Sequence, residues 1–577
     1  MSVSADSVEM QAATRVSCPG KVFMAGGYVV LEQPNRGYVL ATTARFETSV
    51  QSSKGIAGEN EATKITVESP QYRQTIEIEA TPVKESADVK VVRTNGSKNP
   101  YVEQTVSVAV AAARVLRKRW EFAEDLKEVF LASEGPKSLS EAELKEIVAY
   151  HFRFAEEKFL GSTNVVAAKV LAAAKALSAS PERVAALNPA LASVQSFDDV
   201  DTSTIVSMSP GAEALSKGET HVPVVAAMPS SMSIMLRADN DFYSQQSHLA
   251  ARGLPYNTSS LATLEPYMPC INESGDVEVS KTGLGSSAAM VSSLVSAVIL
   301  DLFPAFKDHV NLDTLHSVAQ LAHGVIQGKI GSGFDVCVAL FGSMRYVRYD
   351  PKGLEDPLNR LCEARDASAA TPTDAILASL SRLDYETTPF ALPPRLQLMC
   401  GDVRGGSESP SMSRDVLKWR KSAPPEELMY WDLLIASNDA VASCVETLHK
   451  MAVADRAAYD HMLDVFASTG EAGPALKALH DAFAEVRVCL RKIGEFAKVP
   501  IEPTSQTELC DKTEGQPGVV MSGVPGAGGF DAVFAVVVDT SRAAVERFWE
   551  SLPAPTQVCA LLLHEDGRHP GLVVETA

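Results

Sequence analysis

Residues 281–289 read KTGLGSSAA and run directly into an apolar stretch that extends to Leu300. Glycine lets the backbone turn tightly and has no side chain, so bare N–H groups can come close to an oxyanion. The apolar stretch predicts a buried helix, whose N-terminus carries roughly half a positive charge. The segment therefore favours a phosphate site, in which Ser286 and Ser287 bind phosphate oxygens or Mg²⁺. Taken alone, it is also compatible with a simple glycine turn before a capped helix.

Two other kinds of phosphate loop do not fit this sequence. A Walker loop requires GxxxxGK followed by Ser or Thr, and the nearest stretch, residues 324–329, has a different spacing. The order Gly283-x-Gly285-x-x-Ala288 matches a relaxed dinucleotide fingerprint. However, Asp301 ends the helix, whereas the ribose-binding acid of such a site ends a second strand. A dinucleotide site is therefore disfavoured.

Three further glycine-rich segments surround a charged side chain. A lysine buried in a Pro/Gly turn is costly unless it meets an anion, and a glycine loop that ends in an acid can present a carboxylate at a site. The segments are residues 17–28 (SCPGKVFMAGGY, with Lys21), 328–335 (GKIGSGFD, with Asp335) and 522–532 (SGVPGAGGFDA, with Asp531). Each alone also fits a plainer structure: a solvated lysine, a helix cap with a surface aspartate, or a tight turn that Asp531 supports.

The composition limits the class of protein. The chain has 577 residues, of which 46% are hydrophobic and 21% charged, so it is globular and long enough for one large core or for two. A net charge of -20 disfavours nucleic acid and anionic lipid as partners. The nine cysteines show no CxxC pair, which is typical of reduced cytosolic thiols. The sequence shows neither a secretory signal nor a membrane span. We therefore expect a cytoplasmic protein that binds no nucleic acid and no membrane.

The order of apolar and polar segments gives a coarse map. Residues 16–45 predict strand, turn and strand, and residues 62–93 alternate in the manner of antiparallel strands. Residues 276–279 also predict a strand, leading into the glycine loop. Residues 118–222 are charged or polar and predict a solvated excursion, and the polar, Pro-containing residues 351–394 predict an interdomain linker.

Together, these motifs resemble the GHMP kinase family, which comprises galactokinases and the homoserine, mevalonate and phosphomevalonate kinases. Within the family the likeness is greatest to the phosphomevalonate kinases of fungi and plants, and it covers nearly the whole chain apart from the two polar regions. Several motifs in the family's order are far more specific than any one alone, and they favour the functional interpretations over the plainer ones. The likeness is carried by PGKVFMAGGYVVLE, KTGLGSSAAM, GKIGSGFDVCVALFGSMRYVR, IEPTSQTELCD and SGVPGAGGFDA.

The resemblance implies roles for individual residues. Lys21 and Asp335 match the catalytic lysine and aspartate, and Ser287 matches the serine that touches metal and phosphates. Mevalonate kinases carry a metal-binding glutamate eleven residues before the aspartate, where this chain has Gly324, so the full Mg²⁺ ligand set stays open. The residues implied in ATP phosphate binding are Lys281, Gly283, Leu284, Gly285, Ser286, Ser287 and Ala288.

A serine-rich segment at residues 404–420 bears on the identity of the acceptor. Ser409 is a good N-cap and Pro410 an apt first helical residue, so the N–H groups that follow form a second anion site. Arg414 and Lys418 lie one turn apart behind it. In phosphomevalonate kinases a similar segment faces the acceptor; a capped surface helix is the alternative. The residues implied in acceptor binding are Lys21, Ser409, Ser411, Arg414, Gly526 and Gly528.

The family resemblance also implies a fold and a reaction. The fold is α+β and two-lobed: a ribosomal S5 domain 2-like lobe over residues 1–350, a linker over 351–394, and a ferredoxin-like lobe over 395–577. The reaction is phosphorylation of 5-phosphomevalonate to 5-diphosphomevalonate by ATP with Mg²⁺, in the mevalonate pathway to isoprenoids. Two alternatives remain: another kinase of the family, such as mevalonate kinase, and a non-catalytic sensor with the same fold. Residues 404–420 and Gly324 count against the first, and the intact Lys21, Ser287 and Asp335 against the second.

Overall fold

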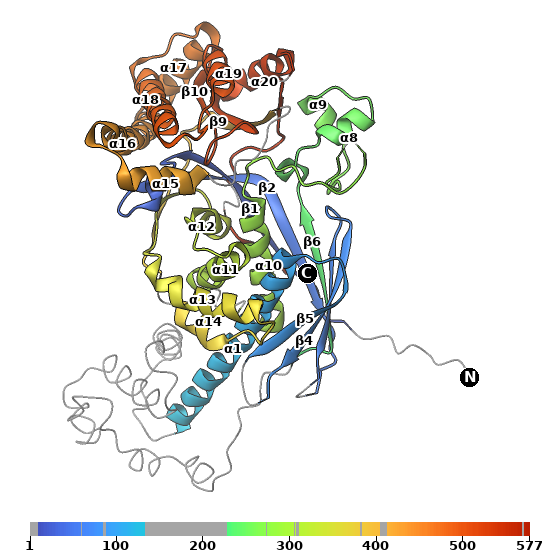
Figure 1. The fold of residues 1–577 in the computed structure, drawn as a ribbon. Coiled ribbons are helices and arrows are strands. Elements are labelled where there is room, and N and C mark those ends of the chain that lie inside the picture. The colour runs from blue at the N-terminus through green and yellow to red at the C-terminus, as the bar shows by residue number, and fades with distance from the viewer. Residues whose placement is uncertain are drawn as a thin grey trace, which may run out of the picture.

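The chain folds into two lobes that lie one above the other in Figure 1. The computed structural model describes residues 10–58, 61–84, 88–132, 228–272, 274–304, 306, 311–380, 383–403, 412–554, 556–567 and 571–576. The first lobe contains a nine-stranded sheet and the second a four-stranded sheet. No helix among the described residues is both long and apolar enough to cross a membrane.

The sheet of the first lobe is almost entirely antiparallel. Its main path runs β13-β1-β2-β6-β3-β4-β5, with β7 paired to β2 and β8 paired to β7, and β3 and β6 are parallel neighbours. From Thr43 to Ser52 the residues of β2 alternate between half-buried and buried, as expected where one face of a sheet is covered. The strands are β1 (Thr14–Ala25), β2 (Arg36–Ser52), β3 (Thr63–Ser69), β4 (Gln74–Pro82), β5 (Val89–Gly96), β6 (Ser231–Ala238), β7 (Met344–Val347), β8 (Glu386–Pro389) and β13 (Val573–Thr576).

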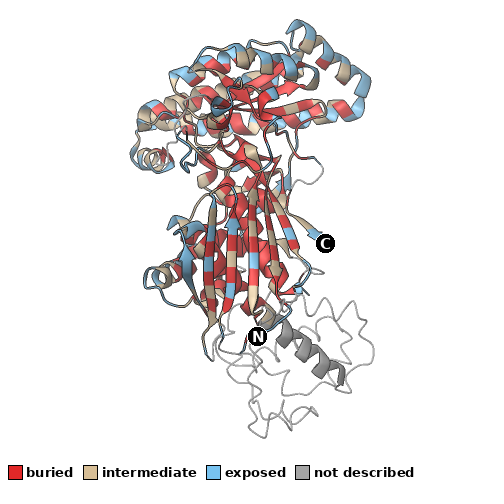
Figure 2. Cartoon of the chain, turned by 90° about the vertical axis from the view of Figure 1, so that its right-hand side faces the viewer, coloured by how far each residue is buried: buried red, intermediate tan, exposed pale blue. Residues whose placement is uncertain are grey.

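Helices cover one face of this sheet, and Figure 2 shows the strands from the other side. The innermost is α10, which contacts β1 and β2 and is buried along nearly its whole length because its sequence is apolar all round. The helices are α1 (Pro100–Ala132), α10 (Ser286–Leu302), α11 (Leu312–Gln327), α12 (Phe334–Phe341), α13 (Lys352–Asp366) and α14 (Thr373–Ser379), with η1 (Val29–Leu31), η3 (Asn240–Phe242), α8 (Gln246–Ala251) and α9 (Thr258–Leu261) near the second lobe.

The second lobe has the ferredoxin-like arrangement. Its sheet runs β10-β11-β9-β12, and every neighbouring pair is antiparallel. In chain order this is strand, helices, strand, strand, helix, strand, with the first and third strands adjacent at the centre. Its elements are β9 (Leu396–Val403), α15 (Met412–Ser422), α16 (Pro425–Ala454), α17 (Arg456–Thr469), α18 (Pro474–Ala497), α19 (Thr504–Glu514), β10 (Val519–Gly523), β11 (Ala532–Val538), η5 (Asp539–Ser541), α20 (Arg542–Ser551) and β12 (Val558–Ala560).

Most of the mapped elements form as expected, and one does not. The strands expected within residues 16–45 and 62–93 are confirmed as β1, β2, β3, β4 and β5. The strand predicted at 276–279 is wrong: Val277 makes only an isolated bridge to Ile271, and Val277 and Val279 are both exposed. The alternation of residue types there lacks a neighbouring strand to pair with, so it builds no sheet.

The two polar regions have different outcomes. Most of the expected excursion at residues 118–222 lies outside the described residues, although α1 continues to Ala132. In place of the expected linker, residues 351–394 form α13, α14 and β8, which pack against α11 or extend the first sheet. The chain also returns to the first sheet at β13. The domain boundaries at 350 and 395 stay a prediction.

Candidate functional site

Lys21 lies within β1 and is buried, with 9% of its surface exposed. Its ammonium Nζ donates a hydrogen bond to the carbonyl oxygen of Gly283 at 2.8 Å, and its backbone N–H donates to that of Leu284 at 2.9 Å. The pairing of β1 with β2 shifts register just before the lysine, and such bulges re-aim side chains. These contacts hold the ammonium group against a loop that is distant in the sequence.

The loop that receives Lys21 depends on its glycines. Gly283 and Gly285 have φ of 77° and 74°, a region that other residues seldom adopt. A Cβ at Gly285 would lie 3.1 Å from both Cγ and Cε of Lys21, so glycine is also needed for the close approach. Gly285 is the N-cap of α10, which begins at Ser286. The N–H of Ala288 donates to the carbonyl oxygen of Gly285 at 3.1 Å, whereas the N–H groups of Ser286 and Ser287 precede the first hydrogen bond of the helix and are available to an anion.

The other predicted phosphate-binding residues lie around this loop. Leu284, Ser286 and Ala288 are buried and fix the loop in the core. Lys281 is half-buried and forms an isolated bridge with Tyr243.

Asp335 lies in the first turn of α12, close enough to Lys21 for its carboxylate to raise the pKa of the ammonium group. The preceding Gly333 has a φ of 82°, and a Cβ there would lie 2.7 Å from the ring of Tyr349, so this turn too requires glycine. The ring of Phe334 has its centroid 5.9 Å from Nζ of Lys21. The 328–335 segment thus brings both an aromatic ring and a carboxylate to the lysine.

The glycine loop of the second lobe approaches Lys21 as well. Gly526 has a φ of 67°, and a Cβ there would lie 3.7 Å from Nζ of Lys21. The hydroxyl of Tyr28, just after β1, donates to the carbonyl oxygen of Ala527 at 2.5 Å. Further along, Gly528 packs so closely that a Cβ would lie 2.0 Å from the carbonyl oxygen of Ile501. All four glycine-rich motifs therefore converge on the ammonium group of Lys21, although they are far apart in the sequence.

The electrostatics of this point favour an anionic ligand. Burial lowers the pKa of Lys21, and the carboxylates of Asp335 and Asp531 oppose that shift. A buried cation next to the open end of a helix is costly on its own. A bound phosphate group would repay that cost, because it pairs with both.

Sequence reasoning missed His323, which is buried on α11 beside the phosphate loop. Its Nε2 lies 3.3 Å from Oγ of Ser287 and 2.9 Å from Nε2 of Gln327. Burial lowers the pKa of the imidazole, which Asp335 raises and Lys281 lowers. The signal was present: His323 follows Ala319 by four residues on the inward face of the helix, where a polar side chain needs a partner.

The predicted acceptor residues are only partly placed. Ser409 and Ser411 lie outside the described residues. Arg414, on α15, has 81% of its side chain exposed and lies 3.8 Å from Asp415. Gly324 stands where mevalonate kinases carry a metal-binding glutamate. It is buried, and a Cβ there would lie 3.2 Å from Leu358 on α13, which leaves little room for a longer side chain.

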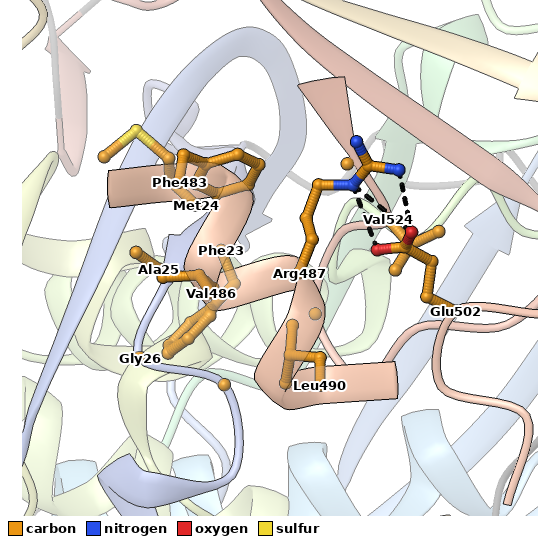
Figure 3. Close-up of a pocket in the computed structure, with 13 residues that line it drawn as sticks. Phe23, Met24, Ala25, Gly26, Phe483, Val486, Arg487, Leu490, Glu502 and Val524 are labelled. Atoms are coloured by element: carbon orange, nitrogen blue, oxygen red, sulfur yellow. Dashed lines mark hydrogen bonds and ion pairs between the residues drawn. The ribbon is translucent and has the colours of Figure 1, made fainter. Parts of the chain in front are cut away.

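A small pocket adjoins the site where the end of β1 faces α18 (Figure 3). Arg487 in its wall is 4% exposed and pairs with three carboxylates: Glu502 at 2.8 Å, Asp511 at 2.8 Å and Glu514 at 2.9 Å. Glu514 also accepts a hydrogen bond from the backbone N–H of Ser522, so this network anchors the start of the glycine-rich segment 522–532. The pocket is lined by Phe23, Met24, Ala25, Gly26, Gly27, Phe483, Val486, Arg487, Leu490, Glu502, Gly523, Val524 and Gly526.

Comparison with known proteins identifies the family to which this arrangement belongs. Residues 271–343, which hold the phosphate loop and Asp335, match the GHMP kinases N terminal domain. A protein of Arabidopsis thaliana named as a peroxisomal phosphomevalonate kinase is 30% identical over 96% of this chain and 95% of its own length. The chain belongs to the GHMP kinase family. The relatives place it in the branch of the plant and fungal phosphomevalonate kinases.

Two further likenesses agree with this assignment. A phosphomevalonate kinase of Candida albicans is 37% identical over 45% of this chain and 58% of its own length. Among solved structures, a Lin0012 protein from Listeria innocua aligns with 98% of this chain and 100% of its own length, with a TM-score of 0.51 and 14% identity. At that identity the structural likeness supports the fold alone. The GHMP kinase fold expected from the motifs is confirmed.

Proposed function

We propose that this chain is a phosphomevalonate kinase, which transfers the terminal phosphoryl group of ATP to 5-phosphomevalonate and releases 5-diphosphomevalonate and ADP in the mevalonate pathway. The observation that carries the proposal is the convergence of the family's glycine motifs on buried Lys21. The full-length likeness to a protein named as a phosphomevalonate kinase supports the choice of acceptor.

In this mechanism the chain positions two anions and neutralises the charge that moves between them. The N–H groups at the start of α10 hold the ATP phosphates, together with Lys281, Gly283 and Ser286. The ammonium of Lys21, held by the Gly283 carbonyl, faces the transferred group and stabilises its charge. Gly526 and Gly528 shape the wall on the acceptor side.

Ser287 and Asp335 fit the needs of a Mg²⁺ ion. Mg²⁺ binds through one or two protein oxygens and takes its other ligands from substrate phosphates and water. Ser287 at the start of α10 offers a hydroxyl, and Asp335 at the start of α12 offers a carboxylate. No group of three His, Cys, Asp or Glu ligands occurs in the described part of the chain, which suits a cation held largely by the nucleotide. When bound, Mg²⁺ would supply positive charge that neutralises the phosphate oxygens during transfer.

Asp335 acts as a positioning carboxylate rather than as an obligatory base. An alcohol acceptor must lose a proton, but a phosphate acceptor has a second pKa of about 6 and is mostly ionised at neutral pH. Asp335→Asn should therefore be impaired, yet its residual rate should follow the ionisation of the acceptor phosphate. A pH–rate profile that instead reveals an essential enzyme base, unrelated to that phosphate pKa, would contradict this role.

The deciding experiment is a coupled assay that compares mevalonate, 5-phosphomevalonate and galactose as acceptors. Turnover with 5-phosphomevalonate alone supports the proposal. Preference for mevalonate would make the chain a mevalonate kinase, and nucleotide binding without turnover on any acceptor would make it a sensor. A tagged copy viewed in cells would show whether it is cytoplasmic, as we propose, or peroxisomal, as the plant relative is named.

A second experiment tests the acceptor site. Replacing Ser409 and Ser411 with Ala, or Arg414 with Gln, should weaken 5-phosphomevalonate binding roughly tenfold, because charge-assisted hydrogen bonds are worth about 1.5–3 kcal/mol each. ATP affinity should change much less. Lys421→Gln removes the same charge from an exposed position on the same helix and is the matched control. Unchanged acceptor affinity in all the variants would place the acceptor phosphate elsewhere.

A further inference from the structure

Three side chains form a chain of contacts behind the phosphate loop. Oγ of Ser287, on α10, lies 3.3 Å from Nε2 of His323, on α11. The same Nε2 lies 2.9 Å from the amide nitrogen of Gln327, one turn further along α11. The two helices pack against each other, and His323 is buried between them with 5% of its surface exposed.

The donor and acceptor roles in this group follow from its chemistry. The amide nitrogen of glutamine only donates, so Nε2 of His323 carries its lone pair and accepts. A nitrogen that carries a lone pair has no proton for the Ser287 oxygen, so the hydrogen bond between them is donated by the Ser287 hydroxyl, which shares this lone pair with Gln327 at the longer distance of 3.3 Å. Its proton then points back toward α11, and its own lone pairs point away from the imidazole.

We infer that His323, held by Gln327, is a positioning residue that turns the lone pairs of Ser287 toward the metal and the phosphates. This inference rests on the proposed function, in which Ser287 is a metal ligand. A serine hydroxyl rotates freely unless a partner fixes it. Partners that orient a metal ligand contribute substantially to metal affinity. The carboxylate of Asp335 also acts electrostatically on the His323 ring, so His323 interacts with both groups proposed to hold Mg²⁺.

The residue after His323 offers no side chain to the site. It is Gly324, and a Cβ there would lie 3.2 Å from a side-chain carbon of Leu358. His323 supplies the support from one residue earlier on the same helix, through Ser287 and not by direct contact with the metal. Its loss should therefore affect the metal-bound nucleotide and spare the metal-free nucleotide.

The test measures binding by calorimetry with a non-hydrolysable ATP analogue, with and without Mg²⁺. His323→Leu should weaken the Mg²⁺-loaded analogue by about tenfold and leave the metal-free analogue within about twofold. His323→Gln keeps an oxygen that accepts a hydrogen bond and should recover most of the loss. Gln327→Leu should show a smaller loss in the same direction.

Two comparisons separate positioning from damage to the fold. His316→Leu removes another buried imidazole from α11, one that is hydrogen-bonded to Gln320 two turns before His323, and should leave Mg²⁺-dependent binding unchanged. The double variant Ser287→Ala, His323→Leu should bind the Mg²⁺-loaded analogue no worse than Ser287→Ala alone, because His323 acts through Ser287.

Each outcome decides the inference. It is overturned by wild-type Mg²⁺ dependence in His323→Leu, by equal losses for the metal-bound and metal-free analogue, or by additive losses in the double variant. If His323→Leu does not fold, the same criteria apply to Gln327→Leu and His323→Gln. The readout needs no acceptor, so it can succeed even if the acceptor is not 5-phosphomevalonate. Wild-type protein that binds neither form of the analogue would refute the proposed function itself.

Discussion

Two glycine-rich loops meet at Lys21, and they differ in the element that follows each of them. The loop around Gly283 and Gly285 opens the helix α10, whereas residues 524–531 open the strand β11. In the first loop, glycine makes room for the side chain of Lys21; in the second, Gly528 makes room for the backbone of Ile501. The N–H groups of a helix start lack partners within the helix, but those of β11 are used in its pairing with β9 and β10.

In the proposed mechanism the two loops therefore have different roles, although both are rich in glycine. A loop that opens a helix can bind an anion with its backbone. A loop that opens a strand lacks the set of unpaired N–H groups that a helix start provides. Glycine content alone does not separate a binding loop from a structural one, and the element that follows does.

The largest effect is expected from removing the side chain on which both loops converge. Lys21→Met keeps the apolar part of the side chain and loses the buried charge, which in the proposed mechanism stabilises the transferred phosphoryl group. Turnover should fall by roughly a hundredfold or more, the usual loss for one preorganised electrostatic group. Because burial lowers the pKa of Lys21, the folding stability should not decrease. Steady-state kinetics and a melting curve check both; a variant with near wild-type turnover would remove Lys21 from the reaction.

A smaller loss is expected from the serine that only the first loop supplies. Ser287→Ala should reduce turnover at least about tenfold, which corresponds to about 1.4 kcal/mol in the barrier, and should hardly change folding. Ser292→Ala, a buried serine further along α10, is the matched control and should keep its turnover. Equal rates in the two variants would show that the hydroxyl at the helix start has no special part in the reaction.

The glycines of the two loops can be compared directly. Gly285 and Gly526 have nearly the same positive φ, so alanine costs each about 1–2 kcal/mol of backbone strain. The new methyl group at 285 would lie 3.1 Å from Lys21 carbons, and that at 526 would lie at an ordinary 3.7 Å from Nζ. We therefore expect similar melting temperatures for the two variants, but a several-fold lower turnover for Gly285→Ala. Equal turnover would mean that strain, and not displacement of Lys21, limits both variants.

The sequence predicted the first loop well because its signals are local. The positive φ, the helix start and the serines all fall within residues 281–289. The ferredoxin-like order of the second lobe and the place of Asp335 followed from the family likeness. The way in which four distant segments meet at one ammonium could not be read from local pattern, because three of them meet by packing within the first lobe and the fourth belongs to the second lobe.

Two of the missed features depend on a partner distant in the sequence, and the third on a helical spacing within a segment that is polar on average. His323 occupies an inward position of α11, and only the approach of Ser287 gives it a role. Arg487 reads as one charge on an amphipathic helix until Glu502 folds back onto it. Residues 351–394 are polar on average, yet Leu354, Leu358 and Leu361 share one buried face of α13. Average polarity hid this spacing, and so the segment was read as a linker.

The smallest expected effect, on stability, comes from two buried aspartates, one beside each glycine-rich loop. Asp402 lies opposite Ala532, where the second loop joins β11, and Ser244 donates a hydrogen bond to its carboxylate at 2.5 Å. Asp241 lies beside the first loop, where its backbone carbonyl accepts from the hydroxyl of Thr282. Burial raises the pKa of Asp402 to about 6 and that of Asp241 to about 6. The base of each loop therefore holds a carboxyl group that is costly to ionise.

The sign of the pH effect follows from that shift. The folded pKa of Asp402 lies above the ordinary value of 3.8, so the folded state holds the proton more tightly than the unfolded state does. Stability from this group is therefore present at low pH, falls as the pH rises from about 4 to about 6, and is level above that. Asp402→Asn cannot ionise and keeps an oxygen that accepts from Ser244. It should melt like the wild type near pH 4 and roughly a few degrees higher at pH 8. Asp432→Asn, at an exposed position on α16, should show no such difference, and an Asp402→Asn gain that is the same at both pH values would exclude ionisation as its cause.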